Sequence, residues 1–203
     1  MSIAEKMAAN QKQVAISEFF EKNKHFLGFD TLTRALITAV KEAVDNALDA
    51  CEEARILPDI IVQITKIDTK KDILQLDVED NGPGIPRTSI EKVFGQLLFG
   101  SRFHAIRQSR GQQGIGITGV VMYSQLTTGY PTHVESKIAT EATAVAVDIG
   151  LDTRKNKAVK SNQDRIDWGD KVHGLRIRTT MKAKYQKGRK SVWQYLRMTS
   201  IVN

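Results

Sequence analysis

The sequence predicts an α+β sandwich, and three observations support this fold class. Residues 31–54 have the apolar periodicity of a long amphipathic helix. Residues 60–67 and 73–79 alternate apolar and polar side chains, as half-buried strands do. Short strand-like stretches separated by polar turns then occupy the chain after Ser124. Helices followed by a run of strands are typical of α+β proteins.

The composition is that of an ordinary globular chain. Its 203 residues are 41% hydrophobic and 26% charged, enough for one large domain or one domain with an appendage. We expect no transmembrane helix, because no apolar run nears 18 residues, and no signal peptide, because residues 1–13 are polar. Cys51 is the single cysteine, which is typical of a cytoplasmic protein, and we interpret it as a small buried helix residue.

The formal net charge of +7 is unevenly distributed. Residues 154–190 hold 13 Lys and Arg against three Asp, an excess of +10, so the rest of the chain is slightly acidic. A basic C-terminal third suggests a polyanionic partner, nucleic acid first. A solvated basic face is an equally good interpretation of the composition alone.

Two helices are expected in the first quarter of the chain, after a polar arm. Residues 14–24 have helical spacing, Gly28 interrupts it, and Asp30 is a suitable N-cap for the next helix. That second helix, residues 31–54, should end before Pro58.

The long helix carries a polar stripe opposite its apolar face. The stripe consists of Glu42, Asn46 and Asp49, and the apolar face of Leu36, Val40, Ala43, Val44, Ala47 and Leu48. Glu42 could accept a proton from water, and the Asn46 amide oxygen could ligate a hard cation such as Mg²⁺. Spacing alone favours a solvated polar face instead.

Two glycine-rich segments bracket a polar loop of roughly 25 residues. The first, Asp80–Ile85, follows the second expected strand, and the second is Gly111–Gly116. Asp-Asn-Gly alone is more often a hairpin turn, but here Pro-Gly-Ile-Pro follows and helical spacing resumes at 89–94. Glycines let a backbone approach a ligand closely. The arrangement indicates a nucleotide site with a cover.

Two familiar phosphate motifs can be rejected. Residues 95–102 superficially match a Walker A loop but lack its lysine. The glycines of 111–116 are spaced G-x-x-G-x-G, the reverse of the dinucleotide fingerprint, and follow a polar loop. They do precede an apolar segment, residues 115–123, and backbone N–H groups at the start of such a helix suit phosphates.

The remaining elements are expected to be mainly strands. They are residues 125–129, 133–139, 142–149, 157–160 and 174–181, followed by a basic, turn-like segment, 182–190, and a short amphipathic segment, 192–198.

Three motifs in this order resemble the GHKL (Bergerat-fold) ATPases: Glu42-x-x-x-Asn46, Asp80-x-Gly82-x-Gly84 and Gly111-x-x-Gly114-x-Gly116. Residues 19–129 are most similar to the B subunits of type IIB DNA topoisomerases, the topoisomerase VI type. The resemblance implies a two-layer sandwich with a mixed, mostly antiparallel sheet and helices on one face. It divides the chain into an arm (1–17), the ATPase domain (18–181) and a basic linker (182–203).

The resemblance also implies roles for individual residues, with ATP and Mg²⁺ as cofactors. Glu42 would be the general base, Asn46 would hold Mg²⁺, and Asp80 would accept a hydrogen bond from the adenine amino group. Gly82 and Gly84 would let the backbone pass the base. The lid would contain Ser101 and Arg102, and the phosphates would be cradled by Arg110, Gly111, Gln112, Gln113, Gly114, Ile115, Gly116 and Ile117.

The sequence departs from the family in two respects. A Gly-Thr pair usually lies under the adenine, whereas the matching place here is His173-Gly174-Leu175; Thr179 or Thr180 could supply the hydroxyl. The helix-two-turn-helix and transducer segments, with the lysine that contacts the γ-phosphate, do not follow. We therefore expect a truncated or minimal ATPase module with slow hydrolysis.

The expected partners follow from the same resemblance. ATP would dimerise two B subunits into a gate, while an A subunit cleaves double-stranded DNA with a tyrosine; no membrane is involved, and the protein would be cytoplasmic and nucleoid-associated. The alternatives are a MutL-like repair ATPase and a non-catalytic nucleotide-sensing or DNA-binding GHKL module. The basic composition disfavours Hsp90, and the absence of a phosphoacceptor helix disfavours a histidine kinase.

Overall fold

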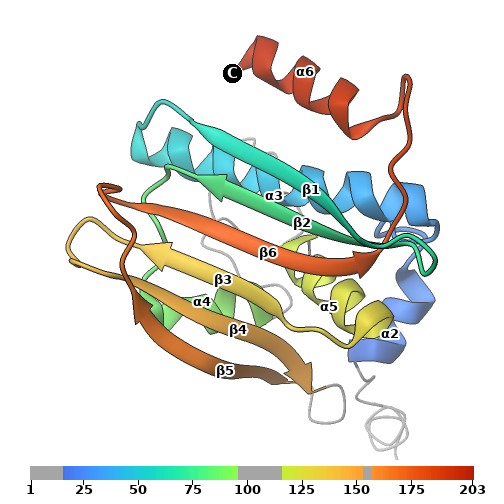
Figure 1. The fold of residues 1–203 in the computed structure, drawn as a ribbon, viewed down its shortest axis with the longest axis horizontal. Helices are drawn as coiled ribbons and strands as arrows, with labels where there is room; N and C mark the ends of the chain where they lie inside the picture. The colour runs from blue at the N-terminus through green and yellow to red at the C-terminus, as the bar shows by residue number, and fades with distance from the viewer. Residues whose placement is uncertain (1–15, 96–115, 153–156) are drawn as a thin grey trace, which may run out of the picture.

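Six strands form one sheet in the order β1-β2-β6-β3-β4-β5 in a computed structural model that describes residues 16–95, 116–152 and 157–203 (Figure 1). All of the described strand pairs are antiparallel, in agreement with the expected mostly antiparallel sheet. The strands are β1 Ile60–Asp68, β2 Ile73–Asp80, β3 Thr132–Lys137, β4 Ala144–Asp152, β5 Lys157–Ile166 and β6 Gly174–Lys182.

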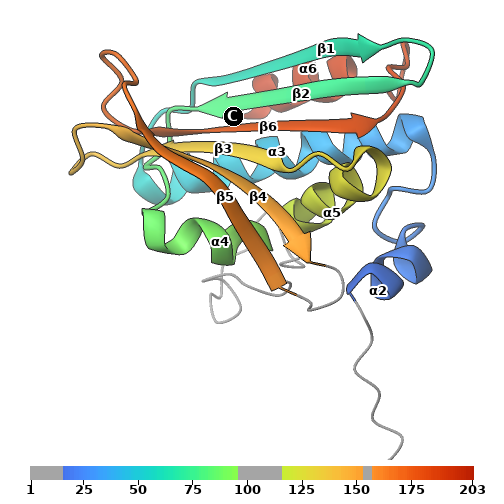
Figure 2. The same cartoon turned by 60° about the horizontal axis from the view of Figure 1, so that its bottom comes forward.

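Helices form the second layer. They are α2 Ile16–Asn23, α3 Leu32–Ala54, α4 Arg87–Gly95, α5 Gly116–Thr128 and α6 Val192–Val202. Helices α3, α4 and α5 cover one face of the sheet, as Figure 2 shows. The core between the layers takes alternate residues of the strands, such as Leu74, Leu76 and Val78 of β2. The expected two-layer sandwich is confirmed.

The long helix α3 begins one residue later than its expected cap. Thr31, not Asp30, is the N-cap: its backbone is extended and its hydroxyl accepts a hydrogen bond from Arg34 N at 3.2 Å. Asp30 instead pairs with the Arg34 and His25 side chains. The helix ends at Arg55, whose left-handed backbone (φ 57°) directs its N–H to the last carbonyls.

The expected strand at 125–129 is wrong, because α5 continues to Thr128. The Thr127 and Thr128 hydroxyls bond carbonyls one turn back, Tyr123 O at 2.7 Å and Ser124 O at 2.8 Å. Gly129, with φ +79°, then ends the helix. Adjacent β-branched residues looked strand-like, but local hydroxyl bonds and packing against β6 keep them helical.

Strand β5 is longer than expected, 157–166 rather than 157–160. Its second half, Ser161–Arg165, is polar and gives no apolar alternation. It lies at the edge of the sheet and pairs with β4 alone, across a register shift between Ala146 and Asp148. A polar edge strand of this kind avoids pairing with other chains, and it is invisible to hydrophobic patterning.

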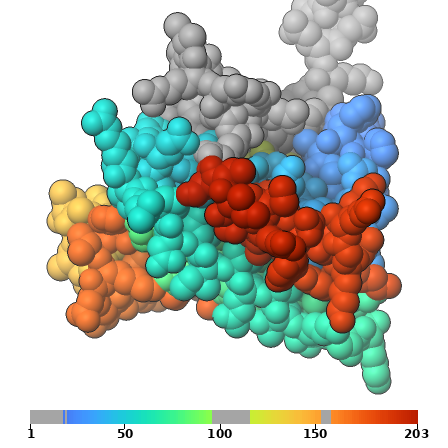
Figure 3. All heavy atoms as spheres, turned by 90° about the horizontal axis from the view of Figure 1, so that it is seen from above, coloured from blue at the N-terminus to red at the C-terminus, as the bar shows by residue number. Residues whose placement is uncertain are grey.

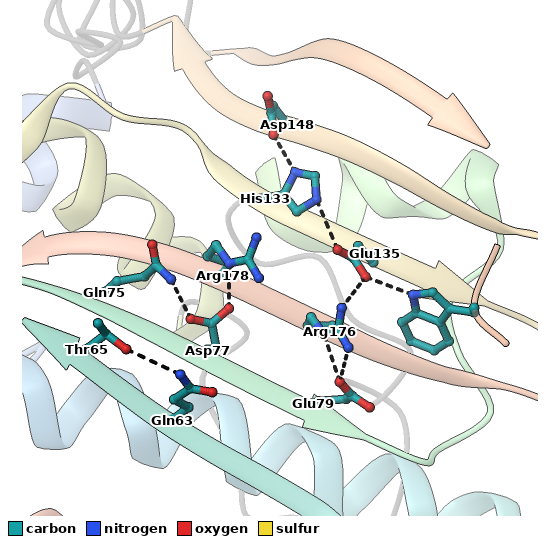
Figure 4. A network of polar contacts seen from close by, with 11 residues as sticks. Gln63, Thr65, Gln75, Asp77, Glu79, His133, Glu135, Asp148, Arg176 and Arg178 are labelled. Atoms are coloured by element: carbon teal, nitrogen blue, oxygen red, sulfur yellow. Dashed lines mark hydrogen bonds and ion pairs between the residues drawn. The ribbon is translucent and has the colours of Figure 1, made fainter. Parts of the chain in front are cut away.

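The sheet face away from the helices, called here the open face, carries a network of charges (Figure 4). Glu135 on β3 accepts hydrogen bonds from Arg176 and from the indole of Trp168, both at 2.8 Å. His133 lies between Glu135 and Asp148, and Arg178 pairs with Asp77 at 2.6 Å. The network crosses β2, β6, β3 and β4, so it joins most of the sheet.

The basic segment and α6 follow β6 on the helix side of the molecule. The segment 183–190 is irregular, as expected, and α6 lies at the surface, red in Figure 3. Val192 is buried, and Tyr195 donates a hydrogen bond to Asp45 of α3 at 2.7 Å. Within the described residues, no helix is long and apolar enough to cross a membrane.

Candidate active site

Helix α3 holds the predicted catalytic residues within the fold rather than on a solvated face. Glu42 and Asn46 are half-buried and Asp49 is buried. The interpretation of the stripe as a solvated polar face is therefore wrong. The reason is tertiary: α5 packs against α3 on this side.

The Glu42 carboxylate lies against the first residue of α5. A Cβ added to Gly116 would collide with Oε2 of Glu42, so a larger residue there would have to displace the Glu42 side chain. Burial raises the pKa of Glu42, and the nearby charge of Asp45 adds to the effect, while Lys41 opposes it. A partly buried carboxyl with a raised pKa is typical of a group that accepts or donates a proton.

Asn46 follows Glu42 by one turn of α3. Within the described residues, neither the Asn46 amide nor the Glu42 carboxylate makes a hydrogen bond. Two half-buried polar groups one turn apart on the same helix can reach the same ligand. An amide oxygen is a suitable ligand for Mg²⁺, and no cluster of His, Cys, Asp and Glu among the described residues could hold a metal by itself.

The turn Asp80–Ile85, called here the aspartate turn, starts where β2 ends. Asp80 is buried, and its carboxylate accepts a hydrogen bond from Gly82 N at 2.8 Å. Burial raises the pKa of Asp80 to about 6, although the backbone N–H groups of Gly82 and Leu175 oppose that shift. A buried carboxylate of this kind is costly for the fold, which is typical of a functional residue.

The glycines of the aspartate turn lie close to neighbouring groups, and only Gly84 would clash with backbone if it carried a Cβ. A Cβ on Gly82 would lie 2.9 Å from Oδ1 of Asp80 and 3.4 Å from Sγ of Cys51. Gly84 has φ +73°, and a Cβ there would collide with the carbonyl of Lys137. The turn therefore packs directly on α3 and on the end of β3.

Several residues that hold this turn were not expected from the sequence. Ser136 both accepts from Ile85 N at 2.7 Å and donates to Ile85 O at 2.9 Å. His173 bonds Gly82 O at 2.8 Å. Asn81 bonds the backbone of Asp59 and Leu57 at 2.9 and 3.0 Å. Their partners are 22 to 91 residues distant in sequence, so no local pattern reveals them.

Cys51 lies beneath this turn, buried as expected. Its thiol is 3.6 Å from Oδ1 of Asn81, and burial raises its pKa to about 11, with a further contribution from Asp80. A thiol with so high a pKa is a poor nucleophile at neutral pH, which agrees with a structural role.

Leu175 lies beside Asp80, at the position where the resemblance predicts the threonine hydroxyl of a Gly-Thr pair. It pairs with Asp80 on one side and with Ser136 on the other. Thr179 pairs with Leu76, four residues or about 13 Å along the strand, and its hydroxyl bonds Thr132 at 3.3 Å. Thr180 also lies beyond Leu175 on β6. Neither threonine is placed to replace the missing hydroxyl.

The predicted lid and most of the phosphate cradle lie outside the described residues: Ser101, Arg102, Arg110, Gly111, Gln112, Gln113, Gly114 and Ile115. Their roles stay predictions. Gly116 and Ile117 are described and begin α5. The side chain of Ile117 is buried in the core, so only its backbone could face a ligand.

A cavity of about 370 Å³ is found elsewhere, between α2, the start of α3 and the end of α5. Its lining includes the aromatic residues Phe20, Phe29 and Tyr123, together with the charged residues Glu21, Lys24 and Asp30. It includes neither Glu42, Asn46 nor the aspartate turn, so it is separate from the candidate site.

Comparison with known families defines the class. Residues 31–154, more than half of the chain, match the family described as histidine kinase-, DNA gyrase B-, and HSP90-like ATPase. The chain therefore belongs to this family, the GHKL ATPases, and membership implies ATP binding. The ATPase region of Saccharomyces cerevisiae topoisomerase II shares the fold, with a TM-score of 0.57 and 14% identity over 94% of this chain and 56% of that one.

Sequence relatives narrow the comparison within the family. The chain is 52% identical over 202 residues to the B subunit of type 2 DNA topoisomerase 6 from Methanococcoides burtonii, covering 99% of this chain and 32% of the relative. It is 52% identical over 198 residues to the protein of the same name from Archaeoglobus fulgidus, covering 97% and 32%. The chain thus spans about a third of the length of these relatives.

Proposed function

We propose that this chain is the ATP-binding and ATP-hydrolysing part of the B subunit of a type IIB DNA topoisomerase. ATP binding would dimerise two B subunits into a gate, which couples hydrolysis to the passage of double-stranded DNA. An A subunit would cleave that DNA. The identity to B subunits of type 2 DNA topoisomerase 6, over nearly the whole chain, supports this proposal.

The observation that carries the ATPase assignment is the arrangement of both half-sites along α3. Glu42 abuts the start of α5, and Cys51 abuts Gly82 of the aspartate turn. Nine residues separate Glu42 from Cys51, about 13 Å along the helix axis. One rigid helix thus sets the distance between the proposed phosphate end and the proposed adenine end of the site.

Each residue would contribute through its own chemistry. Glu42 would orient a water molecule and accept its proton. The Asn46 amide oxygen would ligate Mg²⁺, which supplies charge neutralisation at the phosphates when bound. Asp80 would accept a hydrogen bond from the adenine amino group, and the backbone around Gly116 would face the phosphates. Positioning and charge are the main needs of phosphoryl transfer.

Single-site variants test the catalytic assignment. Glu42→Gln preserves the shape of the side chain but cannot take a proton. We expect it to bind a Mg²⁺–ATP analogue as wild type does, and to lower ATP turnover at least about 100-fold. Equal turnover in the two proteins would instead favour the non-catalytic nucleotide-sensing module. Sedimentation with and without the analogue tests dimerisation.

The proposed DNA-binding surface contains fewer residues than the basic region 154–190 that the sequence indicated. Many basic residues of 154–190 pair with acidic residues: Lys160 with Glu91, Lys171 and Arg176 with Glu79, Arg178 with Asp77, and Lys184 with Asp72. Among the described residues, Lys182, Lys187, Arg189 and Lys190 are exposed and form no ion pair. We infer that the segment 182–190 is the part of the basic region that contacts DNA.

We also propose that the protein is cytoplasmic and nucleoid-associated. The chain is proposed to consist of an arm (1–17), an ATPase domain (18–181) and a basic linker (182–203). The MutL-like alternative has weaker support, because the relatives at 52% identity carry a topoisomerase name.

A further inference from the structure

The aspartate turn depends on a residue outside the three motifs. Gly82 has no side chain, so its backbone is free to rotate unless other groups hold it. Its N–H donates to the Asp80 carboxylate at 2.8 Å, and its carbonyl accepts from His173 at 2.8 Å. The same residue is thus held on one side by Asp80 and on the other by His173.

The bond from His173 has a defined direction. A carbonyl oxygen only accepts hydrogen bonds, so Nδ1 of the imidazole must carry the proton. His173 is half-buried, and Gly174 behind it has φ +148°, with no room for a Cβ against the Asp80 carbonyl. The close packing of the backbone at Gly174 therefore fixes the position of the His173 imidazole.

The segment 167–173 that carries His173 is held on the open face by three contacts. The Trp168 indole donates to Glu135 at 2.8 Å, and Trp168 is itself buried. The Lys171 side chain pairs with Glu79. The carbonyl of Lys171 accepts from the Lys137 ammonium at 2.7 Å. The segment therefore presents His173 to the turn as part of a fixed frame (Figure 4 shows the contacts of Glu135).

We propose that His173 is a positioning residue for adenine-nucleotide binding, which fixes the Gly82 backbone and thereby the Asp80 carboxylate. This inference rests on the proposed adenine contact of Asp80. Without the bond from His173, the turn must be ordered when the nucleotide binds, and affinity falls by the cost of that ordering. The loss of this one hydrogen bond should weaken nucleotide affinity roughly three- to tenfold.

The test is calorimetric titration of this chain with the Mg²⁺ complex of a non-hydrolysable ATP analogue. His173→Ala removes the donor, whereas His173→Asn places an amide nitrogen close to the position of Nδ1. His173→Gln is similar in size and polarity but places its nitrogen near Nε2. Val172→Ala changes an exposed neighbour in the same segment and is the matched control.

We expect His173→Ala and His173→Gln to weaken binding about three- to tenfold, with His173→Asn and Val172→Ala within about twofold of wild type. Should the Ala variant fail to fold, the difference between Gln and Asn carries the same test. Equal affinity of His173→Gln and His173→Asn would overturn the proposal. Asp80→Ala separates the two levels: if it binds as wild type, the adenine site itself is wrong; if it loses binding while His173→Gln does not, only the role of His173 is wrong.

Discussion

The Glu42 carboxylate and the Gly116 backbone are in such close contact that a Cβ on residue 116 would displace the Glu42 side chain. The two residues lie 74 positions apart, on α3 and at the start of α5, and their contact brings two of the three motifs together. If this contact shapes the active site, a substitution that disrupts it should lower ATP turnover while the rest of the fold stays intact.

Gly116→Ala tests this contact directly. The added Cβ must displace either Glu42 or the first turn of α5, so we expect ATP turnover to fall at least about tenfold and stability to fall by about 1–3 kcal/mol. Gly119→Ala is the control in the same helix, because its Cβ would meet Phe29 at an ordinary 3.4 Å. It should preserve turnover and leave stability equal or up to about 1 kcal/mol higher. Similar behaviour of the two variants would contradict the account.

The open-face network should make stability depend on pH. The hydrogen bond from His133 is the main cause that lowers the pKa of Glu135 to about 2, with Trp168 and Arg176 contributing, and the bond to Glu135 raises the pKa of His133. Glu135 then stabilises the fold above its ordinary 4.5, and this stability is lost as the pH falls toward 2. His133 stabilises it below its ordinary 6.5, and this contribution is lost as the pH rises through its raised pKa.

His133→Asn should therefore cost the most between pH about 4.5 and 6.5, by ~1.5–3 kcal/mol, the range for hydrogen bonds to charged groups. The measurement is the difference in unfolding free energy between the two proteins from pH 3 to 9, by denaturant titration. That difference should shrink at both ends of the range. A constant difference across all pH values would mean that His133 acts by packing alone.

Removal of the unpaired cations at 187–190 should weaken DNA binding uniformly across sequences. The triple variant Lys187→Ala, Arg189→Ala, Lys190→Ala should reduce the slope of log affinity against log salt by up to about 3. The control variant Lys66→Ala, Lys70→Ala, Lys71→Ala removes the same charge from β1 and the β1–β2 hairpin. If the two variants weaken DNA binding equally, net charge rather than this segment is responsible.

The sequence predicted most of the fold because its strongest signals are periodic. Helix α3 and strands β1 and β2 were found within one residue at each end, since buried apolar residues recur along them. The end of α5 and the polar half of β5 were missed because there tertiary contacts, not local pattern, decide the structure. Glu42 and Asp80 stand out in the sequence through their motifs and stay predicted site residues. The contacts of Ser136 and His173 with the aspartate turn join distant parts of the chain, so no local pattern reveals them.

The central claim is that adenine binds at Asp80, and calorimetric titration of a non-hydrolysable ATP analogue with Mg²⁺ tests it most directly. Wild type and Asp80→Ala should be compared at neutral pH, above the pKa of about 6 of this carboxyl, where it is ionised. The account predicts binding to wild type and a loss of at least about tenfold in the variant, because a charged acceptor is removed. Equal affinity of the two proteins, or no binding to wild type, would contradict it.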